Sequence, residues 1–269
     1  MTESRLGRFA YLGFCVLVFV FLIAPIIVIV PLSFNAEPYF TFTEGMLRLD
    51  PEAWSFRWYR EILDNEAWRR SLTNSLVIGI SATALATALG TLAALGLSSP
   101  AMPGRRFITG LLILPMITPV IISAAGMFFF YGNLGLGQTH LGLILAHATL
   151  GMPFVVITVV ATLSAFDRNL TRAAASLGAG PVHTFRTVQL PLIAPGVISG
   201  ALFAFATSFD EVVVVLFMGA LEQRTIPRQM WAGIREQISP AILAVATFLV
   251  VFALVLLLTV EWLRRRATA

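Results

Sequence analysis

The chain has 269 residues, of which 58% are hydrophobic and 12% are charged, and its mean hydropathy is +0.86. These values exclude an ordinary soluble globular domain and indicate a protein embedded in a membrane. The formal net charge of +4 would suit nucleic-acid binding in a soluble protein, but the arginines stand mostly at the ends of apolar segments, where charge sets membrane orientation.

Six apolar segments are each long enough to cross a hydrocarbon core of about 30 Å, which takes about 20 helical residues. They cover residues 9–33, 72–97, 106–131, 139–164, 194–218 and 239–263. None of them alternates polar and apolar residues as a membrane strand does. The sequence therefore predicts an all-α polytopic membrane protein with six transmembrane helices, in which residues 1–269 form a single transmembrane domain.

The first apolar segment follows Arg5 and Arg8 and is similar to a signal peptide in charge and position. It is longer than the usual apolar core of a signal peptide and has no clear cleavage site of small residues. We expect a retained membrane anchor. Cys15 is the single cysteine of the chain, so an internal disulfide is excluded.

The polar segment between the first two spans combines aromatic residues with charges at roughly helical spacing. Its aromatic residues include Trp54, Trp58, Tyr59 and Trp68. This pattern suits a helix that lies in the membrane interface with its rings at the depth of the headgroups.

Glycines and prolines mark particular places within the next three spans. The glycines of the second span, which allow close contact between helices, are Gly79, Gly90 and Gly96. The prolines of the third and fourth spans, which free backbone carbonyls and bend helices, are Pro115, Pro119 and Pro153.

His140 and His147 lie seven positions apart and share one helical face of the fourth span. Such a pair could hold a metal or relay a proton. No third ligand stands at a suitable spacing, so we expect packing and hydrogen bonding, with no metal.

Arginines distinguish the two sides of the membrane. With the N-terminus inside, the inner segments carry Arg5, Arg8, Arg105, Arg106, Arg168, Arg172, Arg186, Arg264, Arg265 and Arg266. The outer segments carry eight arginines, but nine acidic residues accompany them. Because only the inner side is clearly basic, we expect both termini and the loop of residues 165–193 in the cytoplasm.

The inner loop of residues 165–193 predicts two short helices. Residues 169–177 are mostly small and helix-forming, Gly178 and the pair Gly180-Pro181 interrupt them, and residues 182–190 can form a second helix. Leu190-Pro191 then begins the return to the membrane. Small side chains on the first helix would let the surface of another protein approach closely.

This loop resembles the EAA loop of the permease subunits of ABC importers. The family pattern is Glu-Ala-Ala, three residues, Gly, nine residues, Ile, one residue and Leu-Pro. The matching residues are Ala173, Ala174, Gly178, Val188 in the isoleucine position, Leu190 and Pro191. Arg172 occupies the glutamate position and reverses its charge, which puts polar contacts of that position in doubt but not the helix.

The resemblance implies a type I ABC importer permease fold in a bacterial inner membrane. It implies that the loop seats a coupling helix in a groove of an ATPase subunit, that two ATPase copies dock on this chain and a homologous permease, and that a periplasmic binding protein delivers substrate. The chain has no phosphate-binding glycine loop, so ATP and Mg²⁺ would act on the ATPase, and we expect neither enzymatic activity nor a bound cofactor in this chain.

Further segments resemble the spermidine and putrescine branch of these permeases. They are Trp58-Tyr59, Asn74-Ser75, Pro153-Phe154 and residues 209–214, which read Phe-Asp-Glu-Val-Val-Val. The resemblance therefore implies a polyamine or a related cation as the substrate.

Asp210 and Glu211 lie about two thirds of the way along the fifth apolar segment. A carboxylate at the centre of a span costs roughly 2.5–3.5 kcal/mol, so such groups usually face a cavity, a partner or water. We expect Asp210 to face the substrate path, on one side with Thr207 and Phe203. Glu211, about 100° away on a helix, would face a neighbouring helix or the partner permease.

Aromatic faces near this path could hold a polyamine by cation–π contact, and the candidates are Phe203, Phe209 and Tyr131. Another interpretation pairs the carboxylates with Arg224 or Arg228 in the next loop. The same architecture could also import ferric iron, thiamine or an aminophosphonate.

Two alternatives belong to other classes. An intramembrane hydrolase would use Ser123 or Ser208 with His140 or His147, but no nucleophile motif with an oriented base is present. A channel or carrier independent of an ATPase would leave the inner loop unexplained.

Overall fold

The computed structural model describes residues 5–99, 101–236 and 239–268. These residues are almost entirely helical and contain no β-strand within the described ranges, apart from one isolated bridge between Asn35 and Trp54. The expectation of an all-α fold is confirmed. The chain divides into two compact units, of which the first holds residues up to Arg69 and from Ala232 onward, and the second holds Arg70–Trp231.

The first unit contains α1 (Arg5–Leu32), α2 (Glu44–Leu47), a 3₁₀ turn η1 (Pro51–Ala53), α3 (Arg57–Asp64) and α13 (Ala241–Thr268). Its centre is Trp58, which is 4% exposed and packs against Ala241 and Ala244 of α13. The Trp58 indole donates a hydrogen bond to the Asn35 carbonyl at 2.7 Å. The unit is therefore organised around a buried aromatic side chain.

This arrangement corrects the prediction of one interfacial helix with an aromatic belt. Trp58 and Trp68 are buried within the protein and do not face headgroups. The helix also ends at Asp64, and Asn65 begins the next one, because its side-chain oxygen accepts the Ala67 amide hydrogen at 2.9 Å.

The second unit contains most of α4 (Glu66–Leu97), followed by α5 (Arg105–Ile117), α6 (Val120–Asn133) and α7 (His140–Ser164). It continues with α8 (Arg168–Ser176), α9 (Pro181–Thr184), the π turn η2 (Phe185–Gln189) and α10 (Leu190–Asp210). The last elements are α11 (Val213–Met218), the 3₁₀ turn η3 (Leu221–Gln223) and α12 (Ile226–Glu236), whose final residues extend into the first unit.

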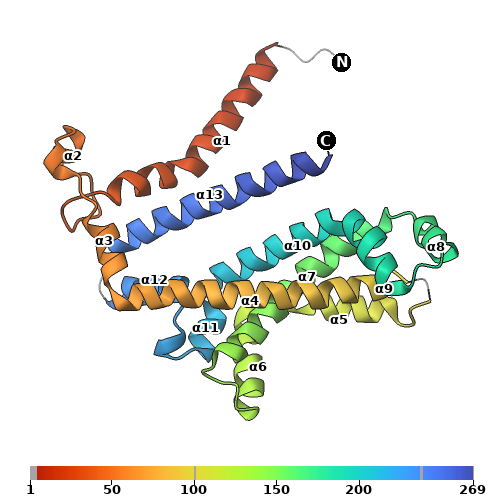
Figure 1. Ribbon diagram of the computed structural model, residues 1–269. Coiled ribbons are helices and arrows are strands. Elements are labelled where there is room, and N and C mark those ends of the chain that lie inside the picture. Colours follow the sequence, from red (N-terminus) through yellow and green to blue (C-terminus); the bar gives the residue numbers. More distant parts are fainter. Residues whose placement is uncertain (1–4, 100, 237–238, 269) are drawn as a thin grey trace. The chain divides into compact units, whose positions relative to one another are not determined.

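Helices α7 and α10 lie side by side and form the core of the second unit with α4 (Figure 1). Glycines permit this close approach, because a Cβ atom on Gly151 would lie 2.9 Å from the Ala204 Cβ, and one on Gly90 would lie 2.8 Å from the Val155 Cβ. The close contact predicted at Gly90 is thus confirmed, whereas a Cβ on Gly96 would approach the Met102 sulfur only to 4.0 Å.

The sequence predicts one span over residues 106–131, but the structure has two helices there. Helices α5 and α6 meet at an angle of 104°, with Thr118 and Pro119 between them. Pro119 fixes an extended backbone before α6 and cannot donate the hydrogen bond that would continue α5. Pro153, in contrast, lies inside an unbroken α7.

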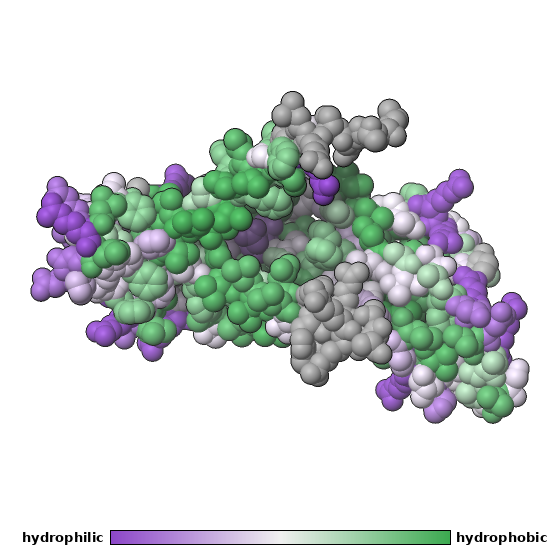
Figure 2. All heavy atoms as spheres, turned by 90° about the horizontal axis from the view of Figure 1, so that it is seen from above, coloured by the Kyte–Doolittle hydropathy of each residue, from purple (hydrophilic) through white to green (hydrophobic). Residues whose placement is uncertain are grey.

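The fifth apolar segment ends earlier than its composition predicts. The expected span of residues 194–218 stops as a helix at Asp210, and Val213–Met218 form the separate helix α11. Five helices of the described chain are long and apolar enough to cross a membrane, or six if the bent pair of α5 and α6 is one span. Figure 2 shows hydrophobic residues over broad areas of the surface, as contact with lipid or a membrane partner requires.

Candidate functional site

The inner loop folds into a compact element that we call the elbow, residues 168–190. It begins with α8, which Asp167 caps by accepting the Asn169 amide hydrogen at 2.9 Å. At the other end of α8, Gly178 has a φ of +84°, and the Ala179 amide donates to the Ala174 carbonyl at 3.0 Å. Gly178 therefore stands where the chain reverses in a left-handed conformation, as its place in the motif predicts.

The second half of the elbow differs from the expected short helix of residues 182–190. The chain is continuously helical from Pro181 to Asp210, so Leu190-Pro191 does not interrupt it. The π turn η2 ends at Gln189, two residues before Pro191. A wider turn makes room for the proline ring, which would otherwise clash with the carbonyl four residues earlier.

The outer surface of the elbow is apolar or small. Leu177 is 89% exposed and Val182 is 65% exposed, next to the exposed Ala173 and the half-exposed Ala174. Exposed leucine and valine beside small residues form a surface on which another protein can pack closely. Val188 and Leu190 of the motif are half-buried and support the elbow from within.

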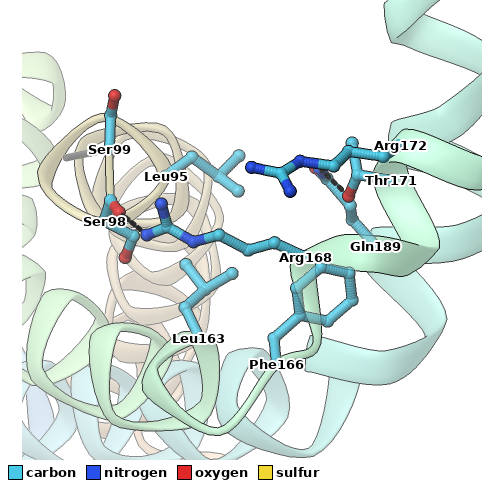
Figure 3. A pocket seen from close by; sticks show the side chains of 9 residues that line it. All are labelled: Leu95, Ser98, Ser99, Leu163, Phe166, Arg168, Thr171, Arg172 and Gln189. Atoms are coloured by element: carbon cyan, nitrogen blue, oxygen red, sulfur yellow. Dashed lines mark hydrogen bonds between the residues drawn. The ribbon is translucent and has the colours of Figure 1, made fainter. Parts of the chain in front are cut away.

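A cavity of about 420 Å³ lies behind α8, between the elbow and the ends of α4 and α7. Figure 3 shows the Arg168 and Arg172 side chains reaching into it from α8. The Arg168 guanidinium donates a hydrogen bond to the Ser98 carbonyl, and Gln189 donates to the Thr171 hydroxyl at 3.3 Å (Figure 3). The charge-reversed residue Arg172 thus points back toward α4, and no acidic residue lines the cavity.

The two acidic residues at the end of α10 have different environments. Glu211 is not helical, with φ of −73° and ψ of 123°. Its carboxylate accepts the amide hydrogens of Val213 at 2.6 Å and Val214 at 3.0 Å and so caps α11. The prediction that both carboxylates occupy helical positions within one span is therefore wrong. Of the two neighbours expected for Glu211, a neighbouring helix or the partner permease, Glu211 contacts the neighbouring helix α11.

Asp210 is the last residue of α10 and is exposed. Among the described residues, no hydrogen bond or ion pair engages its carboxylate. Phe203 is 55% exposed and stacks on Phe154 with ring centroids 6.0 Å apart, and Thr207 is half-buried one turn before Asp210. Exposed Asp210 and Phe203 share one face of α10, as predicted.

Tyr131 belongs to a different environment from the one expected. Its ring packs against a buried cluster that includes Leu143, Val214 and Met218. The alternative ion pair with Arg224 is also not formed: Glu211 accepts backbone amide hydrogens, and Arg224 donates to the Gln229 side chain at 3.2 Å.

Asn74 connects three parts of the second unit, although in the sequence it stands out only through the resemblance of the pair Asn74-Ser75. Its amide donates to the carbonyls of Glu222 at 2.7 Å and Arg224 at 2.9 Å, and its oxygen lies 3.0 Å from His140 Nε2. The Ser75 hydroxyl accepts the Ile226 amide hydrogen at 2.8 Å. The hydrogen-bonding role expected of His140 is confirmed, and an asparagine at the start of an apolar span was the signal for this connection.

His147 and Ser208 form a buried pair between α7 and α10, with Nδ1 and Oγ 2.8 Å apart. They are 1% and 5% exposed, and within the described part of the chain His147 Nε2 has no hydrogen-bond partner. A hydrolase would need an accessible serine and a residue that orients the histidine. The pair meets neither requirement, and the described residues contain no group of three or more potential metal ligands.

Solved structures of known transporters share this fold. A chain of a bacterial ABC transporter involved in the import of the acidic polysaccharide alginate matches with a TM-score of 0.73 at 17% identity, over 97% of this chain and 98% of that chain. A chain of the inward-facing MetNI methionine ABC transporter matches with a TM-score of 0.58 at 18% identity, over 84% and 100%. The fold is that of an ABC importer permease.

Sequence comparison then gives the family. Residues 86–269 match the model described as the binding-protein-dependent transport system inner membrane component, and the chain belongs to this family. It is accordingly a multi-pass inner-membrane transport protein and not an enzyme.

Curated relatives match nearly the whole chain. The spermidine/putrescine transport system permease protein PotC of Haemophilus influenzae is 30% identical over 94% of this chain and 96% of the relative. PotC of Escherichia coli strain K12 is 29% identical over 98% and 97%. The putrescine transport system permease protein PotI of the same strain is 31% identical over 86% and 82%.

Proposed function

We propose that this chain is the transmembrane permease subunit of an ATP-driven importer for spermidine, putrescine or a related cationic solute. The match to polyamine permeases over nearly the full length supports this substrate class. The importer would move its substrate from a periplasmic binding protein to the cytoplasm.

The observation that carries the choice of a cation is the exposed carboxylate of Asp210. A protonated amine that sheds water needs a negative acceptor, and Asp210 has no competing partner among the described residues. Phe203 on the same face offers an aromatic surface for methylenes and ammonium groups. In this proposal Glu211, which caps α11, and Tyr131, which packs in a buried cluster, stabilise the fold around the substrate path.

The partner proposal rests on the elbow. Its exposed Leu177 and Val182, with small residues between them, suit a groove on an ATPase subunit. Both termini and the elbow face the cytoplasm, in keeping with the arginines of the inner segments. Two ATPase copies serve this chain and a homologous permease, and ATP and Mg²⁺ act on the ATPase.

The proposal is tested by purifying the tagged chain from its native membrane and reconstituting the co-isolated complex in vesicles. We expect an ATPase and a second six-span protein in the complex, and ATP-dependent spermidine uptake that putrescine inhibits. Stronger competition by ferric iron, thiamine or an aminophosphonate would change the substrate class. Transport by the chain without an ATPase would instead support a channel or carrier.

A further inference from the structure

A second cavity, separate from the one behind α8, lies between α5, α7 and the end of α4. We call it the α5–α7 groove, and its volume is about 620 Å³. One end carries Arg105 and Arg106, the first two residues of α5. Its wall is formed by hydrocarbon side chains, which include Ile113 of α5 and Ile157 and Val160 of α7.

The charged end of the groove lacks a counter-ion within the described part of the chain. Both arginines are exposed, no acidic residue lines the groove, and none stands in the first turn of α5. No ion pair joins either guanidinium to another described residue. The positive end of the α5 dipole adds to the same potential, so an anion would be stabilised here by several sources of positive charge.

The wall of the groove belongs to the membrane-spanning part of the molecule. Helix α7 is one of the described helices long and apolar enough to cross a membrane, and Ile157, Val160 and Ala161 lie in its last two turns. Ile157 is 39% exposed. The groove therefore offers hydrocarbon contacts that extend from the arginines toward the bilayer interior.

We propose that the α5–α7 groove binds an anionic phospholipid. Arg105 and Arg106 would hold the headgroup phosphate through guanidinium hydrogen bonds, and an acyl chain would lie along Ile113, Ile157 and Val160. A soluble phosphate would leave the hydrocarbon wall uncovered, and an apolar helix of another protein would leave both guanidinium charges without a partner. This inference is independent of the transported substrate.

The test uses the purified complex in nanodiscs that contain equal amounts of phosphatidylglycerol and phosphatidylethanolamine, with retained lipids measured by native mass spectrometry. We expect phosphatidylglycerol to be retained preferentially. The double variant Arg105→Gln/Arg106→Gln should reduce its retention about tenfold. The matched control Arg48→Gln/Arg60→Gln, which removes two exposed arginines outside the groove, should leave retention unchanged.

A second variant separates a lipid from a simple anion. The larger side chain of Ile157→Trp should occupy the space along the hydrocarbon wall of the groove. It should reduce phosphatidylglycerol retention although both arginines remain. Equal retention of the two lipids, or displacement of phosphatidylglycerol by water-soluble glycerol phosphate, would overturn the proposal. So would a photo-crosslinker at Ile113 that captures a protein and no lipid.

Discussion

At the scale of single residues, two adjacent carboxylates have become chemically distinct because the backbone changes between them. Asp210 ends a helix with its carboxylate exposed, and Glu211 turns its carboxylate onto the amides of α11. One group therefore remains available to a cation, and the other is used by the fold. Charge-neutralising variants should separate the two roles.

Asp210→Asn should lower spermidine uptake at limiting substrate about tenfold or more, because it removes a charge-assisted contact worth about 1.5–3 kcal/mol. Co-isolation of the partner subunits should be unchanged, since Asp210 supports no described contact. Asp210→Glu, the matched control, should retain more uptake than Asn. Full uptake by Asp210→Asn would remove this residue from the substrate path.

Glu211→Ala should destabilise the protein by about 1 kcal/mol, the usual value of a helix cap. Glu211→Gln keeps an oxygen that can accept the Val213 and Val214 amide hydrogens, so it should lose less. Thermal unfolding of the purified variants measures both. If Glu211→Gln lowered uptake as much as Glu211→Ala while its thermal stability stayed normal, the charge of Glu211 would act on the substrate and not on the fold.

At the scale of elements, the elbow depends on one backbone conformation. A Cβ atom on Gly178 would meet nothing within 4 Å, so the demand for glycine comes from φ and not from space. Gly178→Leu should cost about 1–2 kcal/mol locally and lower uptake per ATP hydrolysed. Gly178→Asn, which tolerates the left-handed region better, should lie nearer the natural protein. Unchanged coupling in Gly178→Leu would show that the bend is not needed.

Helix contact in the second unit depends on a different property of glycine, its small size. Gly90→Ala should destabilise the protein by roughly 1–3 kcal/mol, because the added methyl meets Val155 of α7. Gly110→Ala is the matched control, since a Cβ there meets nothing within 4 Å. Thermal unfolding compares the two, and equal midpoints would contradict the packing described between α4 and α7.

The sequence contained enough to predict most elements, because long apolar runs and turn residues are local signals. Residues 72–97 and 139–164 agree closely with α4 and α7, and Gly178 bends the chain as its motif requires. The break before Pro119 and the end of α10 at Asp210 were missed, since apolar composition continues across both. The length of an apolar run predicts how much of the chain lies in lipid, but it does not predict where the backbone changes direction.

The functional site could be predicted only in part, because only residues that are close in the sequence leave a local signal. The elbow motif is contiguous, so its residues could be found together. Asn74, however, bonds residues 148 and 150 positions away, and nothing local in the sequence indicates those partners. The capping role of Glu211 likewise required knowledge of where α10 ends.

At the scale of the whole molecule, the proposed orientation places the elbow and the α6–α7 connection on opposite sides of the membrane. In a Cys15→Ser background, Leu177→Cys should react with an impermeant maleimide in inside-out vesicles, and Leu134→Cys should react in right-side-out vesicles. Both side chains are exposed, at 89% and 58%, so access does not limit the reaction. The reverse pattern would place the elbow outside the cell and remove its proposed ATPase contact.

The unbroken helix from Pro181 to Asp210 gives the molecule a mechanical property. Its 30 residues span about 45 Å, so a partner pressing on the elbow and a solute held at Asp210 would act on opposite ends of one continuous helix. Tilting this helix about its contact with α7 would displace its two ends in opposite directions at the same moment. In an importer built this way, the timing of solute release would follow directly from the stroke of the motor.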